Sequence, residues 1–396
     1  MTREELTQQY LQSKSNHYIL QLPTGYGKTK LALQKADQWY SEDCKVLIVI
    51  PRNVMIKEWK KEIEKWKYDK FLKNITFSTY VSFPRHHRTN WDIVIFDEGH
   101  HTSERCREAI DAFNIKRTIV LSATLKKDHL FFFRTKYHPE IYNIKVKDAI
   151  ENEVLPDPKL ILIPFFLDNQ TPNYYIEKNF KKDGSTNSWI TIDYTQKWKY
   201  RSYKGAYRIK CTQKQYYEDL SSLVEWYKNK GKGNARFKNM WLHKAGERLK
   251  WLAHQKLVEV RKILKVLSNY RTLIFCPSIE DSNTVGSPCI NSKVGTANLE
   301  LFNNKNIKHI AAVGMLDEGA NLIDCKVGIF QMINASDRIT VQRIGRILRH
   351  KKPVLIFPYY VNSREQEIVE EIIKDYNPEL ITKLHPVSLS SIKDYL

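Results

Sequence analysis

The sequence predicts an α/β protein with two domains in tandem, each built around a parallel β-sheet. The length of 396 residues corresponds to two or three domains at roughly 150 residues each. Short apolar runs alternate with amphipathic stretches, as in successive strand and helix units. The apolar runs are nearly continuous rather than alternating, which is typical of strands that helices cover on both faces.

A first series of such units occupies residues 1–150. Its apolar runs predict strands at 18–22, 45–50, 75–77, 93–96 and 118–121, and its amphipathic stretches predict helices at 29–39 and 54–66. A second series follows the breaks at Pro156 and Pro158, with strands expected at 160–163, 272–276, 307–313, 327–330 and 354–357. We therefore place the domains at 1–150 and 151–396, and the second includes a less regular, basic insertion at about 170–245.

The chain is strongly basic, with 64 Lys and Arg against 44 Asp and Glu and a net charge of +20. An excess of this size favours a polyanionic partner, and we expect nucleic acid rather than a membrane. The 42% of apolar and 27% of charged residues exclude a disordered or fibrous protein. No apolar run approaches the ~18 residues of a membrane span, and residues 1–10 contain no apolar signal region. We expect a cytoplasmic protein.

The six cysteines are scattered along the chain and form no C-x-x-C pair. In a chain of this length we interpret them as reduced, buried thiols. The adjacent pairs His86–His87 and His100–His101 have no Cys or His partner at zinc-ligand spacing. A structural metal site is therefore not expected.

Much of the excess charge lies in one segment, Lys197–Tyr270. It contains 19 Lys and Arg against 5 Asp and Glu, and tyrosines and tryptophans stand between the basic residues. Cations that neutralise phosphates, beside rings that stack on bases, are typical of proteins that bind single strands. The alternative is a solvated basic helix surface whose aromatic residues form a local core.

A phosphate-binding loop is predicted between the first expected strand and helix, in the sequence Pro23–Thr29. Gly25 and Gly27 allow a tight turn that directs backbone N–H groups at phosphate oxygens, and the following helix N-terminus adds partial positive charge. Lys28 would reach the β- and γ-phosphates, and the Thr29 hydroxyl would bind Mg²⁺. The full pattern has a glycine where this chain has Leu22.

Two adjacent carboxylates follow the expected strand 93–96. A carboxylate at the carboxyl end of a strand faces the crevice in which ligands bind to open α/β sheets. Asp97 suits an outer contact to Mg²⁺, and Glu98 suits polarisation of an attacking water. The next expected strand ends in Ser122-Ala123-Thr124, for which turn capping is the default explanation.

Near the C-terminus, the sequence 342–349 carries arginines at spacings of three, so that they can lie near one helix face. A planar guanidinium suits the charge that develops on a γ-phosphate during transfer. The alternative is an exposed basic helix.

In this order and spacing, the motifs resemble those of the superfamily 2 helicases of the DEAD/DEAH type, which are nucleic-acid-dependent ATPases with two RecA-like P-loop domains. The likeness spans residues 18–360, and the sequence D-E-G-H at 97–100 is closer to the DEAH form. The segments that correspond to the family's motifs are 23–29, 50–52, 77–80, 97–100, 122–124, 273–276, 314–321 and 342–349.

The resemblance implies ATP and Mg²⁺ as cofactors. The residues implied for nucleotide binding are Thr24, Gly25, Tyr26, Gly27, Lys28, Thr29 and Gly319, and those implied for Mg²⁺ are Thr29 and Asp97. Hydrolysis is assigned to Glu98 and, from the second domain, to Gln342, Arg346 and Arg349. Coupling of hydrolysis to strand movement is assigned to His100, Ser122 and Thr124, and nucleic-acid contact to Pro51, Arg52 and Thr79.

Two features leave parts of this assignment open. The family's fifth motif often has Gly-x-Asp, whereas Asn321 stands in the acidic place here, which puts a ribose contact in doubt. The glutamine that reads adenine is expected near the N-terminus, where Gln8 and Gln9 are both candidates.

Within the superfamily, the short second domain is most similar to compact helicases of phages and large DNA viruses, which favours DNA over RNA. The resemblance is compatible with a role in a larger replication, repair or restriction assembly. Three alternatives share the motifs: a double-strand DNA translocase that does not unwind, an RNA helicase, and an ATP-gated nucleic-acid clamp without turnover.

Overall fold

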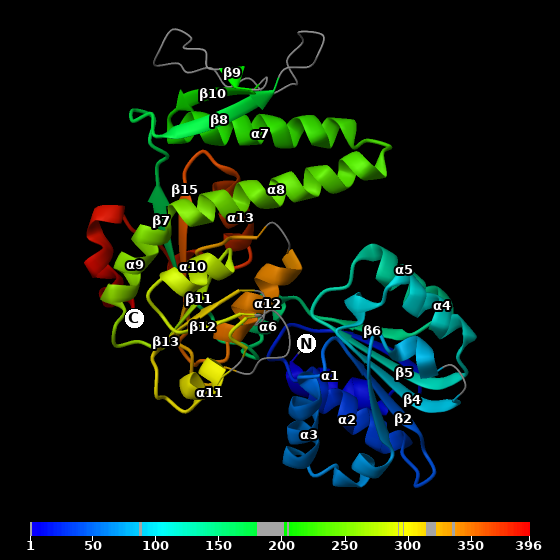
Figure 1. The fold of residues 1–396 in the computed structure, drawn as a ribbon. Helices are drawn as coiled ribbons and strands as arrows, with labels where there is room; N and C mark the ends of the chain where they lie inside the picture. Colours follow the sequence, from blue (N-terminus) through cyan, green and yellow to red (C-terminus); the bar gives the residue numbers. More distant parts are fainter. Residues whose placement is uncertain are drawn as a thin grey trace.

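The structure is a computed structural model. It describes residues 2–86, 89–179, 202–203, 206–291, 293–295, 297–313, 322–334 and 337–396. These residues form two parallel β-sheets with their helices, and a helical hairpin that projects beside the second sheet (Figure 1).

The first sheet has six parallel strands in the order β3-β2-β4-β5-β1-β6. Its strands are β1 (His17–Gln21), β2 (Val46–Ile50), β3 (Ile75–Thr79), β4 (Trp91–Asp97), β5 (Ile115–Ser122) and β6 (Glu140–Asn143). Its helices are α1 (Arg3–Gln12), α2 (Lys28–Trp39), α3 (Met55–Lys65), α4 (Glu104–Ala112) and α5 (Lys127–Tyr137). The predicted strands and both predicted helices are thus present, and the strand β6 and the helices α1, α4 and α5 are additional.

Successive residues of the central strands belong to two different apolar clusters. In β4, for example, Ile93 and Ile95 pack into one cluster, whereas Val94 and Phe96 pack into the other. Because neighbouring residues of a strand point to opposite faces, both faces of this sheet are covered. This explains the continuous apolar runs in the sequence.

The second sheet has seven parallel strands in the order β12-β13-β11-β14-β15-β7-β16. Its strands are β7 (Lys159–Phe165), β11 (Thr272–Phe275), β12 (Cys289–Ile290), β13 (His309–Ala312), β14 (Val327–Ile329), β15 (Val354–Tyr360) and β16 (Ile381–Lys383). Its helices are α9 (Leu257–Val266), α10 (Ile279–Thr284), α11 (Ala297–Asn303), α12 (Asp337–Ile347) and α13 (Arg364–Ile373). The short helix α6 (Val146–Glu151) lies between the two sheets in sequence.

The segment between β7 and α9 is more regular than the sequence predicted. It holds a small antiparallel sheet of β8 (Tyr174–Asn179), β9 (Ser202–Tyr203) and β10 (Ala206–Cys211). It then forms helices α7 (Gln213–Lys230) and α8 (Ala235–Gln255), of 18 and 21 residues. The expectation of an irregular segment was wrong here because the apolar face of α7 is built largely from tyrosines between charged residues.

Short 3-10 helices complete the fold, at Asp69–Lys73, Phe83–His86, Gly99–His101, Pro378–Leu380 and Pro386–Tyr395. The six cysteines are all buried and free of disulfides, as predicted. Among the described helices, none combines the length and the apolar character that a membrane crossing requires.

Candidate active site

The carboxyl ends of four neighbouring strands of the first sheet bring the sequence motifs together. Strands β2, β4, β5 and β1 are adjacent and parallel, so the loops that follow them emerge at one edge. The register pairs Gln21 with Ser122 and Asp97 with Leu121. The phosphate-binding loop, the paired carboxylates and the Ser122–Thr124 segment are therefore neighbours in space.

The loop before α2 has the predicted geometry of a phosphate-binding turn. Gly25 and Gly27 have φ angles of +90° and +100°, which side chains rarely tolerate. Tyr26 N–H closes the turn by donating to the Pro23 carbonyl at 3.2 Å. Because α2 begins at Lys28, the positive end of its dipole faces this loop.

Lys28 lies near charged groups of both domains. Its Nζ donates to the carbonyl oxygens of Leu22 at 2.8 Å and Pro23 at 3.3 Å. Desolvation lowers the pKa of Lys28, and Arg346 and Arg349 lower it further, whereas Glu98 and Asp97 raise it. The pKa of Lys28 thus responds both to the carboxylates at the end of β4 and to the arginines that α12 and the turn after it supply from the second domain.

Asp97 is almost fully buried and is held by two groups from other elements. The Trp59 indole Nε1 donates to Asp97 Oδ2 at 2.8 Å, and the Tyr80 hydroxyl donates to the Asp97 carbonyl at 2.8 Å. Burial raises the pKa of Asp97 to about 7, together with the charge of Glu98, while Trp59 and Lys28 act in the opposite direction. The carboxylate is therefore fixed in position but costly to ionise.

Glu98 occupies a strained backbone conformation, with φ +52° and ψ +57°. Its Oε2 lies 3.3 Å from Nδ1 of His100, and that same ring nitrogen lies 3.1 Å from Ser122 Oγ. Ser122 Oγ donates to the Thr124 carbonyl at 2.9 Å and accepts from Thr124 N–H at 3.3 Å. His100 Nδ1 thus bonds to the segment predicted to couple hydrolysis to movement, and Glu98 Oε2, which has no hydrogen-bond partner among the described residues, lies beside it.

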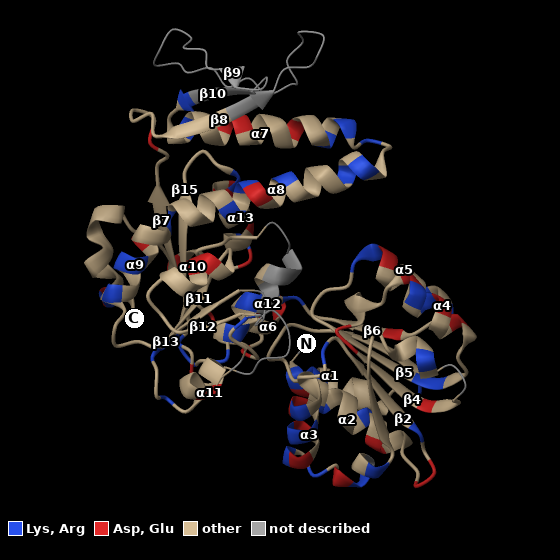
Figure 2. Cartoon of the chain, viewed as in Figure 1, with Lys and Arg blue, Asp and Glu red and all other residues tan. Residues whose placement is uncertain are grey.

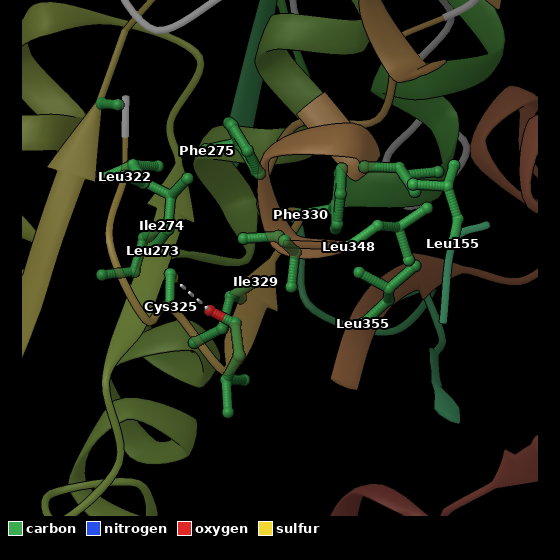
Figure 3. Packing of buried hydrophobic residues seen from close by; sticks show 14 of the residues in the cluster. Leu155, Leu273, Ile274, Phe275, Leu322, Cys325, Ile329, Phe330, Leu348 and Leu355 are labelled. Carbon is green, nitrogen blue, oxygen red and sulfur yellow. Dashed lines mark hydrogen bonds between the residues drawn. The ribbon is translucent and has the colours of Figure 1, made fainter. Parts of the chain in front are cut away.

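The second domain reaches this loop through α12. A Cβ on Gly345 would lie 2.6 Å from Thr24 Cβ, so only glycine allows α12 to pack this closely on the phosphate-binding loop. Leu155 contacts the same loop, because a Cβ on Gly25 would lie 3.4 Å from its Cδ2. Leu155 also belongs to the apolar cluster that contains Leu348 of the second domain (Figure 3).

The two predicted arginines of α12 and its C-terminal turn face the first domain. Arg346 is buried, at 6% exposure, and it lies close enough to Lys28 to affect the pKa of that lysine. Desolvation and the charge of Arg346 lower the pKa of Arg349 to about 10, whereas Glu58 and Glu62 on α3 raise it. Both arginines therefore stay charged at neutral pH, at the boundary between the domains.

Two predicted residues cannot be placed at this site. The backbone of Gln342 belongs to α12, but its side chain lies outside the described part of the chain. Gly319 and the rest of 314–321 also lie outside it. The roles implied for Gln342 and Gly319 stay predictions.

Arg3 is a site residue that the sequence analysis missed. A Cβ on Gly27 would lie 2.5 Å from Arg3 Nη2, and the charge of Arg3 lowers the pKa of Tyr26 against the larger effect of burial. Gln8 and Gln9, the adenine candidates on the same helix, are exposed. Helical spacing in the sequence places Arg3 on the buried face of α1, because the buried residues Leu6 and Tyr10 follow it three and seven positions later.

The residues predicted to contact nucleic acid lie on the other side of β4. Pro51 and Arg52 directly follow β2, and Thr79 ends β3, the strand at the sheet edge. Arg52 is exposed, and Thr79 Oγ1 donates to Ser82 Oγ at 3.2 Å. These three residues and the motifs predicted to bind nucleotide therefore all lie at the carboxyl ends of the strands. The three residues lie at the ends of β2 and β3, whereas the predicted nucleotide motifs lie at the ends of β1, β4 and β5.

Two comparisons of the sequence find similar proteins. Residues 3–127 match the profile of the family "Type III restriction enzyme, res subunit". The chain is also similar to the DNA 3'-5' translocase XPB2 of Sulfurisphaera tokodaii, with 24% identity over 361 residues that cover 85% of this chain and 76% of the relative.

Solved structures share the fold at low sequence identity. Dbp5 of S. cerevisiae bound to RNA and ADP BeF3 matches with a TM-score of 0.62 and 12% identity, over 100% of this chain and 93% of that one. The Type ISP restriction-modification enzyme LlaBIII bound to DNA matches with a TM-score of 0.56 and 13% identity, over 100% of this chain and 32% of that one. The predicted fold of two tandem RecA-like domains is confirmed. The ordered motifs, the paired parallel sheets and these similarities support the resemblance to the superfamily 2 helicases and translocases.

Proposed function

We propose that this protein uses ATP bound between its two domains to move along nucleic acid, with DNA as its substrate. The observation that supports this most directly is the electrostatic environment of Lys28. It combines two carboxylates from the first domain with Arg346 and Arg349 from the second. A γ-phosphate bound at Lys28 would therefore contact both domains, and its release would remove that link.

The donors in the cleft fit a magnesium ion bound with a nucleotide. Mg²⁺ is usually held by one or two protein oxygens together with phosphates and water, rather than by a cage of side chains. The Asp97 carboxylate, which the Trp59 indole orients at 2.8 Å, supplies one such oxygen. Thr29 and Asp97 would hold the ion, and the ion would supply charge stabilisation for the transferred phosphoryl group.

Within the proposed mechanism, Glu98 orients the attacking water, and Arg346 and Arg349 stabilise the charge that spreads over the γ-phosphate. Gln342 would complete the site from the second domain. His100 would transmit the state of Glu98 to Ser122 and Thr124, since its ring nitrogen lies within 3.3 Å of both Glu98 and Ser122 oxygens. Loss of the γ-phosphate would then loosen α12 and allow the domains to separate.

The choice of DNA rests on the similarity to a protein named as a DNA translocase, together with the net charge of +20. Pro51, Arg52 and Thr79 would contact the strand mainly through its backbone, which implies little sequence specificity. We further propose a cytoplasmic location, a kinship with compact phage and large-virus helicases, and a role as the motor of a larger replication, repair or restriction assembly.

The test is ATP turnover measured with single-stranded, duplex and forked DNA and with the same forms of RNA. We expect stimulation by DNA in the wild-type protein and its loss in Lys28→Ala and Glu98→Gln. Unwinding of a fork separates a helicase from a double-strand translocase, which would displace a triplex strand instead. Stronger stimulation by RNA would point to an RNA helicase, and binding without phosphate release would point to a clamp.

A further inference from the structure

The tip of the α7–α8 hairpin is a dense cluster of exposed cations. Residues 226–242 contain five Lys and Arg and no Asp or Glu. The five side chains are all exposed, and they are Lys228, Lys230, Lys232, Arg236 and Lys238. Figure 2 shows this basic tip at the end of the hairpin that lies farthest from the second sheet. Lys228 pairs with Glu225 at 3.3 Å, and the cluster as a whole keeps an excess of positive charge that a polyanion would neutralise.

These cations stand on ordered backbone. Gly233 adopts φ +84°, and Asn234 Oδ1 accepts hydrogen bonds from the N–H groups of Arg236 and Phe237, which caps the start of α8. Behind the turn, the ring of Trp226 packs edge-on against Tyr227 and Phe237, with centroid distances of 4.8 and 5.9 Å. The turn therefore presents its charges in a fixed arrangement.

The aromatic residues of the described hairpin serve its packing. Tyr217 and Tyr227 are buried, and Tyr216 packs against Trp251 with a centroid distance of 5.0 Å. Of the rings that the sequence suggested for base stacking, Tyr216, Tyr217, Tyr227 and Trp251 are thus packed in a local core, whereas Trp226 is 37% exposed beside the basic tip. Five cations beside one partly exposed ring favour contact with phosphates over contact with bases.

The base of the hairpin is fixed to the second domain. Gln331, which follows β14, donates from Nε2 to the Ala253 carbonyl of α8 at 3.1 Å. Lys256 is fully buried and donates to Glu365 Oε1 at 2.6 Å and to the Pro358 carbonyl at 2.7 Å. The hairpin will therefore move with the domain that carries Arg346. In Figure 1 its tip projects beyond the second sheet, on the side where the first domain lies.

We propose that the α7–α8 tip is a second nucleic-acid contact, which binds the sugar-phosphate backbone of duplex DNA. The first contact is the one proposed for Pro51, Arg52 and Thr79. This proposal rests on the proposed function and deepens it. Because the hairpin and α12 belong to the same body, closure of the cleft on ATP would shift the gripped duplex relative to the first domain. A membrane surface fits less well, since membrane-bound helices insert an apolar face.

The test compares two triple variants of the full chain. Lys230→Gln, Lys232→Gln and Lys238→Gln together remove tip charges, and Lys265→Gln, Lys383→Gln and Lys393→Gln together are the matched control from α9, β16 and the C-terminal 3-10 helix. All six lysines are exposed, so the thermal unfolding midpoints should match the wild type. Fluorescence anisotropy with labelled duplex DNA, single-stranded DNA and duplex RNA is measured over a salt series, alongside stimulated ATP turnover.

We expect the tip variant to bind duplex DNA at least about tenfold more weakly than the control at about 0.1 M salt. The slope of log affinity against log salt concentration should become shallower by about 2 to 3, or roughly 0.9 for each phosphate that the variant no longer neutralises. Equal binding by the two variants would overturn the hairpin assignment while wild-type binding and turnover uphold the proposed function. A loss confined to single-stranded DNA or to RNA would equally overturn it. A wild-type protein that neither binds DNA nor hydrolyses ATP would overturn both.

Discussion

The indole of Trp59 donates a 2.8 Å hydrogen bond to the carboxylate of Asp97, the residue proposed to hold the magnesium ion. Trp59 belongs to α3, which follows β2 in sequence, and both side chains are buried. One oxygen of Asp97 is therefore directed by a neighbouring helix. Groups that orient a metal ligand in this way strongly affect metal affinity.

We expect Trp59→Phe to raise the Mg²⁺ concentration that gives half-maximal ATP turnover by about tenfold, because hydrogen bonds to charged groups contribute roughly 1.5–3 kcal/mol. Turnover at saturating Mg²⁺ should change less. The control is Trp66→Phe, since Trp66 makes the same 2.8 Å indole bond to Glu62, a carboxylate that acts on Arg349 rather than on the proposed Mg²⁺ ligand and should leave the Mg²⁺ dependence unchanged. Equal Mg²⁺ dependence in the two variants would show that Trp59 has only a packing role.

The raised pKa of Asp97 predicts that ionisation of its carboxyl group lowers the free energy of unfolding. The carboxyl has a pKa of about 7 in the folded protein against 3.8 for the ordinary side chain. Between these values the folded state holds a proton that the unfolded state has released, so the free energy of unfolding falls as pH rises through this window. Asp97→Asn should therefore raise the unfolding temperature of the nucleotide-free protein at pH 8, and by less at pH 5.

Asp92 provides a control of opposite sign. Partial burial raises the pKa of Asp92, but hydrogen bonds from Lys116 and from the Lys45 backbone outweigh it and hold the pKa low. Its ionised form stabilises the fold, so Asp92→Asn should lower the unfolding temperature at neutral pH. Scanning calorimetry across pH 5–8 measures both variants. A lower unfolding temperature for Asp97→Asn at pH 8 would contradict the assigned cause.

The contact between Gly345 and Thr24 predicts that α12 closes on the phosphate-binding loop only when it carries glycine. In Gly345→Ala, the new Cβ would lie 2.6 Å from Thr24 Cβ and would push the domains apart. We expect stimulated ATP turnover to fall by about tenfold or more, since a displacement of 1 Å can cost 10²-fold in rate. Thr24→Gly should partly restore turnover in the double variant.

The control for this change is Gly246→Ala in α8, where a Cβ would meet no atom within 4 Å. That variant should keep full turnover and gain up to about 1 kcal/mol of stability from its higher helix propensity. ATP turnover and thermal unfolding, measured in parallel, separate the two effects. Full activity in Gly345→Ala would mean that catalysis does not require the closed arrangement.

Most of the fold was predictable because burial on both faces leaves a strong pattern. The continuous apolar residues of β2, β4 and β5 were recognised as strands, and the turn at Gly25 and Gly27 was recognised from its glycines. The chemistry of a phosphate-binding loop is local in sequence, so a short window contains it. The same holds for Asp97 and Glu98, which directly follow a buried strand.

The remaining features depend on contacts between distant segments. Trp59 meets Asp97 across 38 residues, and Gly345 meets Thr24 across the domain boundary, so neither contact leaves a local signal. The tyrosines of α7 looked like base-stacking groups because a sequence does not show that another helix covers them. Arg3 was missed because α1 has too few apolar residues to mark its buried face strongly.

Arg346 should separate nucleotide binding from hydrolysis. Its guanidinium is positioned to stabilise charge that develops on the γ-phosphate only as the bond breaks, so it contributes little to binding the ground state. We expect Arg346→Ala to bind a fluorescent ATP analogue nearly as the wild type does, while turnover falls about 10³-fold or more. Arg346→Lys should recover little of the lost turnover, because a lysine lacks the planar guanidinium and its several N–H donors.

The comparison residue is Arg343, one helical turn earlier. Arg343 Nη1 donates to the Met332 carbonyl at 3.4 Å, and its guanidinium lies 5.1 Å from the centroid of the Phe275 ring. Its role is therefore to fix α12 on the second sheet, and Arg343→Ala should lower the unfolding temperature. Arg346→Ala should not lower it, because removing a buried cation next to Lys28 and Arg349 relieves like-charge repulsion. If Arg346→Ala lost ATP affinity while its turnover per bound nucleotide stayed constant, the arginine would act in binding, and the shared-cleft mechanism would be wrong.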